Sequence, residues 1–91
     1  MIIAKVIGTV VATRKNSNLI GSKFMIVEPL DVMKYDGKRL VAVDQAGAGI
    51  DDLVLVSMGS AARIQSGYEH ASIDAAIVGI VDNPTEIYVK E

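Results

Sequence analysis

The feature that most constrains the fold is a succession of short apolar runs rich in Val and Ile, with no helix of useful length between them. Such β-branched residues favour a pleated sheet. Gly, Pro, Asn and Asp cluster between the runs, which is typical of turns and loops. The pattern predicts five strands, at residues 2–13, 23–27, 40–44, 53–58 and 73–81, followed by a short last strand at residues 87–89.

Strands that follow one another directly exclude a parallel α/β fold and favour an all-β fold, a small antiparallel barrel of the OB type. Gly8 lies inside the first run and predicts a bend or bulge there. The pair Asp36-Gly37 indicates a hairpin turn between two strand-like runs. Residues 60–65 predict one or two helical turns with Ser60 as the N-cap.

The length of 91 residues predicts a single domain over residues 1–91. Hydrophobic residues make up 51% of the chain, more than a monomer of this size readily buries. We therefore expect apolar surface to be buried between subunits.

The bulk numbers also exclude several classes of protein. The net charge of −2 argues against a strong nucleic-acid footprint, and the lack of cysteine excludes disulfides and thiolate metal sites. The start, Met1 to Lys5, does not resemble a signal peptide, and the apolar runs are far shorter than a membrane span. We expect a cytoplasmic protein without a cofactor and without nucleic-acid or membrane partners.

No catalytic constellation stands out. Asp51 and Asp52 are adjacent, so on a strand they would face opposite sides, and they read best as a solvated loop. His70, the one histidine, lies in a polar segment without the partners of a metal site or a triad. Gly47-Ala48-Gly49 lacks the third glycine and the helix of a dinucleotide site, and predicts a tight turn or close backbone contact. We expect no enzyme activity.

A small-residue segment, Gly59-Ser60-Ala61-Ala62-Arg63, directly follows the run at 53–58. Small side chains at a strand end let backbones approach closely. Arg63 either caps a short helix or anchors a neighbouring subunit through a bidentate contact, with Asp74 as a candidate partner. Both roles are favoured over catalysis.

One alternative remains open on the residues alone. Barrels of the OB type bind single strands through basic grooves and stacked aromatic side chains. Basic residues flank the first loop and the expected hairpin, but the aromatic residues are not concentrated on one strand. Binding of single-stranded nucleic acid or of another ligand is therefore the weaker reading.

The motifs taken together resemble the bacterial microcompartment vertex proteins, the small shell proteins of carboxysomes and of organelles for ethanolamine and propanediol. The resemblance begins with the run from Val6 to Lys15 and continues, in the family's order, to Asp82. Ser72 and Leu53 depart from the family's usual proline and tryptophan. The further matches are Leu19, Gly21, Lys23, Val41-Ala42-Val43-Asp44, Gly47-Ala48-Gly49, Val54-Leu55-Val56, Gly59-Ser60-Ala61-Ala62-Arg63 and the segment from Asp74 to Asp82.

The resemblance implies a five-stranded barrel with one short helix, assembled head to tail into a cyclic homopentamer. Such rings cap the vertices of a polyhedral shell whose other tiles are hexagonal shell proteins, which would be the partners of this chain. A hexamer is the less favoured ring, and a narrow central pore is a weaker expectation than capping. The residues expected at the subunit interface or pore are Gly47, Ala48, Gly49, Gly59, Ser60, Ala61, Arg63 and Asp74.

Overall fold

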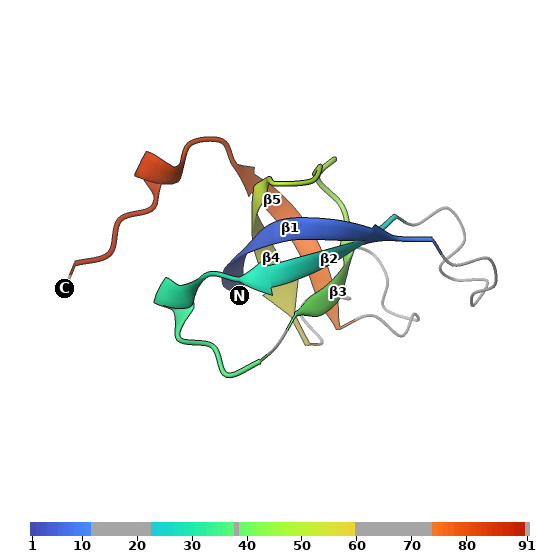
Figure 1. Ribbon diagram of the computed structural model, residues 1–91, viewed down its shortest axis with the longest axis horizontal. Helices are drawn as coiled ribbons and strands as arrows, with labels where there is room; N and C mark the ends of the chain where they lie inside the picture. Colours follow the sequence, from blue (N-terminus) through green and yellow to red (C-terminus); the bar gives the residue numbers. More distant parts are fainter. Residues whose placement is uncertain (12–22, 38, 60–73, 91) are drawn as a thin grey trace.

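The computed structural model describes residues 1–11, 23–37, 39–59 and 74–90, and within them five strands close into a barrel (Figure 1). In this described part of the chain, two short 3-10 helices, η2 and η3, lie outside the barrel wall. The strands are β1 (Ile2–Val10), β2 (Phe24–Pro29), β3 (Leu40–Asp44), β4 (Leu53–Met58) and β5 (Ala75–Val81), and the 3-10 helices are η2 (Asp31–Met33) and η3 (Pro84–Glu86).

The order of strands around the barrel is β1-β2-β3-β5-β4, and every pairing except one is antiparallel. The exception is β3 with β5, which pair in parallel at Val43–Ala76 and Asp44–Ile77. A closed ring with an odd number of strands cannot alternate direction at every step, so one parallel contact is required. The predicted all-β, antiparallel barrel is thus confirmed, and this one parallel seam is what closure of five strands adds to it.

The core follows the two-residue period of the strands. In β1, Ile2, Ala4 and Val6 face inward, while Lys5 between them is exposed. Because successive side chains on a strand point to opposite faces, this alternation directs the apolar residues into the barrel. The largest fully buried side chains are Met25, Ile77, Val6, Val27, Val43, Val54 and Val56.

The bulge predicted at Gly8 is confirmed, because the register between β1 and β2 shifts between Val6 and Gly8. A Cβ at Gly8 would lie 3.4 Å from Cδ1 of Ile26, the residue paired with it. Glycine therefore lets the Ile26 side chain close over β1. A second shift lies between β4 and β5, because Leu55 pairs with Gly79 and Val56 pairs with Ile77. The extra residue is Val78 on β5, beside Gly79.

Two predicted elements near the turns are wrong. Residues 87–89 form no strand, because the barrel is closed and leaves no edge on which a sixth strand could pair. β2 and β3 do pair as an antiparallel hairpin, but Asp36-Gly37 is not a tight turn between them, since the connection is longer and contains η2. Lys34 ends η2 in the left-handed conformation, at φ 49°.

Some strand ends also differ from the prediction. β1 ends at Val10, β2 begins at Phe24 and continues to Pro29, and β5 begins at Ala75. Pro29 is tolerated because its position pairs only with Ala4 of β1, whereas the β2–β3 ladder stops at Val27. The helical turns predicted at residues 60–65 lie outside the described residues.

Candidate functional site

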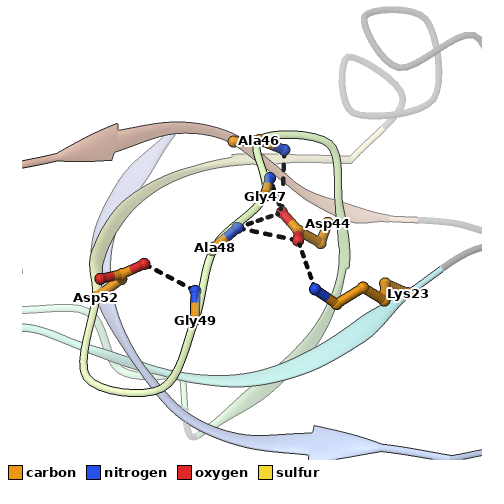
Figure 2. Close-up of polar contacts among 7 residues, drawn as sticks. All are labelled: Lys23, Asp44, Ala46, Gly47, Ala48, Gly49 and Asp52. Carbon is orange, nitrogen blue, oxygen red and sulfur yellow. Dashed lines mark hydrogen bonds and ion pairs between the residues drawn. The ribbon is translucent and has the colours of Figure 1, made fainter.

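Asp44, the last residue of β3, organises the glycine-rich loop that follows it (Figure 2). Its Oδ1 accepts hydrogen bonds from the backbone N–H groups of Ala46 at 3.0 Å and Gly47 at 3.1 Å. Ala48 donates its N–H to Oδ1 at 3.2 Å and to Oδ2 at 3.0 Å. The N–H groups that would be needed to cradle a phosphate are therefore occupied by the protein's own carboxylate, which supports the interpretation of the loop as a tight turn.

Lys23 partly balances the charge of Asp44. Its Nζ lies 3.7 Å from Asp44 Oδ2, and the backbone N–H of Asp44 donates to the Lys23 carbonyl at 2.8 Å. The Asp44 side chain is 2% exposed, whereas that of Lys23 is 65% exposed. The start of β2 is thus tied to the end of β3 by one backbone bond and one solvated ion pair.

The second half of the loop is held by Asp52, whose Oδ2 accepts the N–H of Gly49 at 2.7 Å (Figure 2). Val6 donates its backbone N–H to the Asp52 carbonyl at 2.9 Å, and Asp51 donates to the Val6 carbonyl at 2.8 Å. Asp51 has φ 72°, and its carboxylate lies 3.5 Å from Lys5 Nζ. The two carboxylates therefore belong to a turn docked on β1, and they form no catalytic pair.

The small residues of this loop have different surroundings. Ala48 is 2% exposed and belongs to the hydrophobic core, whereas Gly47 and Gly49 are exposed. Gly47 has φ 76°, a conformation that residues with a Cβ rarely adopt. The placement of all three at a subunit contact stays a prediction, and within the subunit the Ala48 methyl group packs inside its own barrel.

Gly59 and Asp74 lie side by side, because the Gly59 N–H donates to the Asp74 carbonyl at 2.7 Å. Gly59 has φ 68°, and Asp74 is exposed just before β5. The contact expected between Asp74 and Arg63 stays a prediction, since Ser60, Ala61, Ala62 and Arg63 lie outside the described residues, as does His70. Gly49 precedes β4 and Gly59 follows it, so the two candidate segments lie at opposite ends of that strand.

A groove between the end of β2 and the β2–β3 connection was missed by the sequence reasoning. Its volume is about 450 Å³, and an ion pair between Arg39 Nε and Glu28 Oε2, 2.8 Å apart, lies along it. The Tyr35 ring covers Gly37 so closely that a Cβ on Gly37 would lie 1.8 Å from Tyr35 Cε2. The lining residues are Glu28, Pro29, Leu30, Asp31, Lys34, Tyr35, Gly37 and Arg39.

Within the described ranges, no group of three or more His, Cys, Asp or Glu side chains is arranged to hold a metal ion. Among the same residues, no helix has the length and apolar character needed to cross a membrane.

The family model described as ethanolamine utilisation protein EutN/carboxysome matches residues 1–82. The chain belongs to the EutN/CcmL family. This membership confirms the resemblance that the motifs from Val6 to Asp82 carry. It does not favour the alternative of a barrel that binds single-stranded nucleic acid.

Relatives within the EutN/CcmL family are similar to this chain over nearly their whole length. The bacterial microcompartment shell vertex protein GrpN of Rhodospirillum rubrum is 51% identical over 83 residues, which cover 90% of this chain and 93% of GrpN. The carboxysome shell vertex protein CcmL of Synechocystis sp. is 47% identical over 83 residues, covering 90% of this chain and 83% of CcmL.

Solved structures of EutN/CcmL-like proteins share the fold. The pentameric GrpN shell protein superposes with a TM-score of 0.78 over 91% of this chain and 95% of GrpN. The pentameric shell protein MSM0273 from the RMM microcompartment is 31% identical and has a TM-score of 0.82, with 100% of this chain and 99% of MSM0273 covered.

Proposed function

We propose that this protein is a structural shell protein of a bacterial microcompartment, which forms a cyclic homopentamer and caps the vertices of the shell without catalysing a reaction. The observation that carries the proposal is the family match over residues 1–82, in a chain that folds as one closed barrel. The similar proteins GrpN and CcmL are named shell vertex proteins. The pentameric state of GrpN and MSM0273 supports the same assembly for this chain.

The mechanism of capping is geometric. Flat sheets of hexagonal tiles do not close, and a fivefold unit introduces the curvature that a polyhedral shell needs. A ring of identical barrels uses a heterologous interface, in which one surface of a subunit contacts a different surface of the next. Such an interface needs apolar side chains on the outside of the barrel.

The outer wall supplies apolar side chains of this kind. Val41 of β3 is 54% exposed, and its cross-strand partner on β2 is the half-buried Ile26. Val78 of β5 is also exposed. Isolated exposed apolar residues are common, but together with the high apolar fraction of the chain they support burial between subunits.

We assign the subunit contact or pore to the exposed backbone of Gly47 and Gly49, and to the segment that begins at Gly59 and includes Ser60, Ala61 and Arg63, with Asp74 beside it. Ala48 contributes from within, by holding the loop in the core. Hexagonal shell proteins of the same compartment are the proposed partners, and residues 1–91 act as one domain.

The experiment that tests the proposal has two readouts. Native mass spectrometry of the purified chain at micromolar concentration should give a pentamer. Electron microscopy of shells formed with co-expressed hexagonal shell proteins should show closed polyhedra with this chain and unclosed shells or tubes without it. A monomer, or closed shells in its absence, contradicts the proposal.

The segment after Gly59 is tested separately with Arg63→Ala and Ser60→Trp. Both variants should keep the circular dichroism of the folded barrel and lose ring assembly or shell closure. If both variants still form normal rings and closed shells, the segment has no role in assembly.

A further inference from the structure

The C-terminal tail leaves the barrel and exposes apolar side chains (Figure 1). After η3, Tyr88 is 83% exposed and Val89 is 45% exposed, while Lys90 is also exposed. The hydrogen bonds at the start of the tail are local, such as Thr85 N–H to Asn83 Oδ1 at 3.0 Å. Among the described residues, no hydrogen bond or ion pair ties residues 88–90 to the barrel.

The groove between β2 and the β2–β3 connection has features that suit such a tail. Pro29, Leu30 and the Tyr35 ring offer apolar surface, and the volume of about 450 Å³ lies in the range of pockets that hold small organic groups. Asp31 and Lys34 line the same groove and have no ion-pair partner within the described part of the chain. In Figure 1 the connection and the tail extend from the barrel toward the same side of the view.

We propose that residues 87–90 of one subunit dock in this groove of the next subunit in the ring. Tyr88 is the apolar anchor, as tyrosine often is at the centre of an interface, and Lys90 lies opposite Asp31. The inference rests on the proposed function, because only a ring brings a second copy to the groove. In a closed head-to-tail ring every groove receives one tail, and no tail remains exposed.

Two observations support a second copy as the occupant. Tyr88 gains almost no burial from its own subunit, and no tail residue lines the groove of that subunit, so the tail is not packed there. The alignment with the pentameric MSM0273 covers 100% of this chain, tail included, although the family match ends at residue 82. The tail therefore has a structural counterpart in a protein that is assembled as a pentamer.

Disulfide trapping tests the contact directly, because the natural chain has no cysteine. The full-length double variant Asp31→Cys/Tyr88→Cys is oxidised and run on non-reducing gels. We expect covalent dimers to pentamers, which reducing agent converts to monomers. Thr9→Cys/Tyr88→Cys is the matched control, since Thr9 is exposed on β1 outside the groove, and it should remain monomeric on the gel.

The outcomes separate this inference from the proposed function. A disulfide within one chain, seen as a faster monomer band, overturns docking between subunits, and so does the absence of any disulfide. Native mass spectrometry of the same samples shows whether rings are present. Rings without cross-links refute tail docking alone, whereas monomers refute the pentamer as well.

Tyr88→Ala provides a second measurement that needs no cysteine. Loss of the aromatic anchor should raise the concentration at which rings dissociate by at least about tenfold, as truncation of an interface hot spot does. Tyr88→Phe keeps the ring and should retain most of the affinity. An unchanged dissociation concentration for Tyr88→Ala overturns the assigned role of Tyr88.

Discussion

Ala48 donates one backbone N–H to both carboxylate oxygens of Asp44, at 3.2 and 3.0 Å, while its methyl group lies in the barrel core. The Asp44 carboxylate thus connects a polar loop to apolar packing. The presence of both residues in the motifs has a physical basis, because the carboxylate accepts the N–H groups of the loop and the small Ala48 side chain packs in the core.

Replacement of Asp44 by Ala should destabilise the subunit by about 1–3 kcal/mol, because it leaves backbone N–H groups of a partly buried loop without their acceptor. Urea unfolding at a fixed protein concentration measures the effect. Asp82→Ala removes an exposed carboxylate and should change the free energy of unfolding by less than about 0.5 kcal/mol. Equal effects of the two changes would contradict the capping role of Asp44.

Lys23→Met should cost less than about 1 kcal/mol, although Lys23 pairs with the same carboxylate. Its ammonium group is well solvated, so the ion pair is screened, and the backbone bond between Lys23 and Asp44 does not depend on the side chain. The same urea titration checks this. If Lys23→Met lowered the free energy of unfolding as much as Asp44→Ala does, the ion pair with Lys23, and not the hydrogen bonds to the loop, would be the main contribution of Asp44 to stability.

Gly47→Ala should destabilise the protein by about 1–2 kcal/mol, because the residue has φ 76°. No atom lies within 4 Å of the added Cβ, so the cost is one of backbone conformation and not of packing. Gly49→Ala is the matched control, since its φ is not in the left-handed region and its nearest neighbour would be Asp52 Oδ2 at 3.7 Å. Thermal unfolding should rank wild type and Gly49→Ala together, above Gly47→Ala.

Ile77→Ala should cost about 2–5 kcal/mol, because Ile77 is completely buried in the core and its truncation leaves a cavity. Val78→Ala, on the adjacent outward-facing position of β5, should cost much less in the unfolding of the subunit. If Val78 instead proves as costly as Ile77, the assignment of inner and outer faces on β5 is wrong.

The barrel strands could be predicted from the sequence because their information is local. Alternation of buried and exposed residues marks β1, the ranges of β3 and β4 agree with the prediction, and Gly8 marks the bulge. Residues 87–89 have the same apolar, β-branched character but form no strand. The difference lies in the partner, since a strand needs a free edge and the closed barrel offers none.

The candidate site was only partly predictable for a similar reason. The sequence singled out Gly47-Ala48-Gly49 as a tight turn, but it did not show that Asp44 and Asp52 supply the acceptors for its N–H groups. No motif in the sequence predicts the groove at Tyr35, since Asp36-Gly37 predicts a tight hairpin turn in its place. Its formation depends on how a long connection packs beside β2, which no short motif encodes.

Patterns along the chain are enough to predict the all-β class, most strand positions and, through the motifs, the family to which the chain belongs. The parallel seam between β3 and β5, the burial of the Ala48 side chain in the core and the exposure of Tyr88 arise only when the barrel closes. The tendency of a segment to form a strand or a turn depends on its neighbours along the chain, so it can be predicted from the sequence. The closure of a barrel with an odd number of strands depends on contacts between residues far apart in the chain. The same closure decides which segments find a partner and which remain exposed.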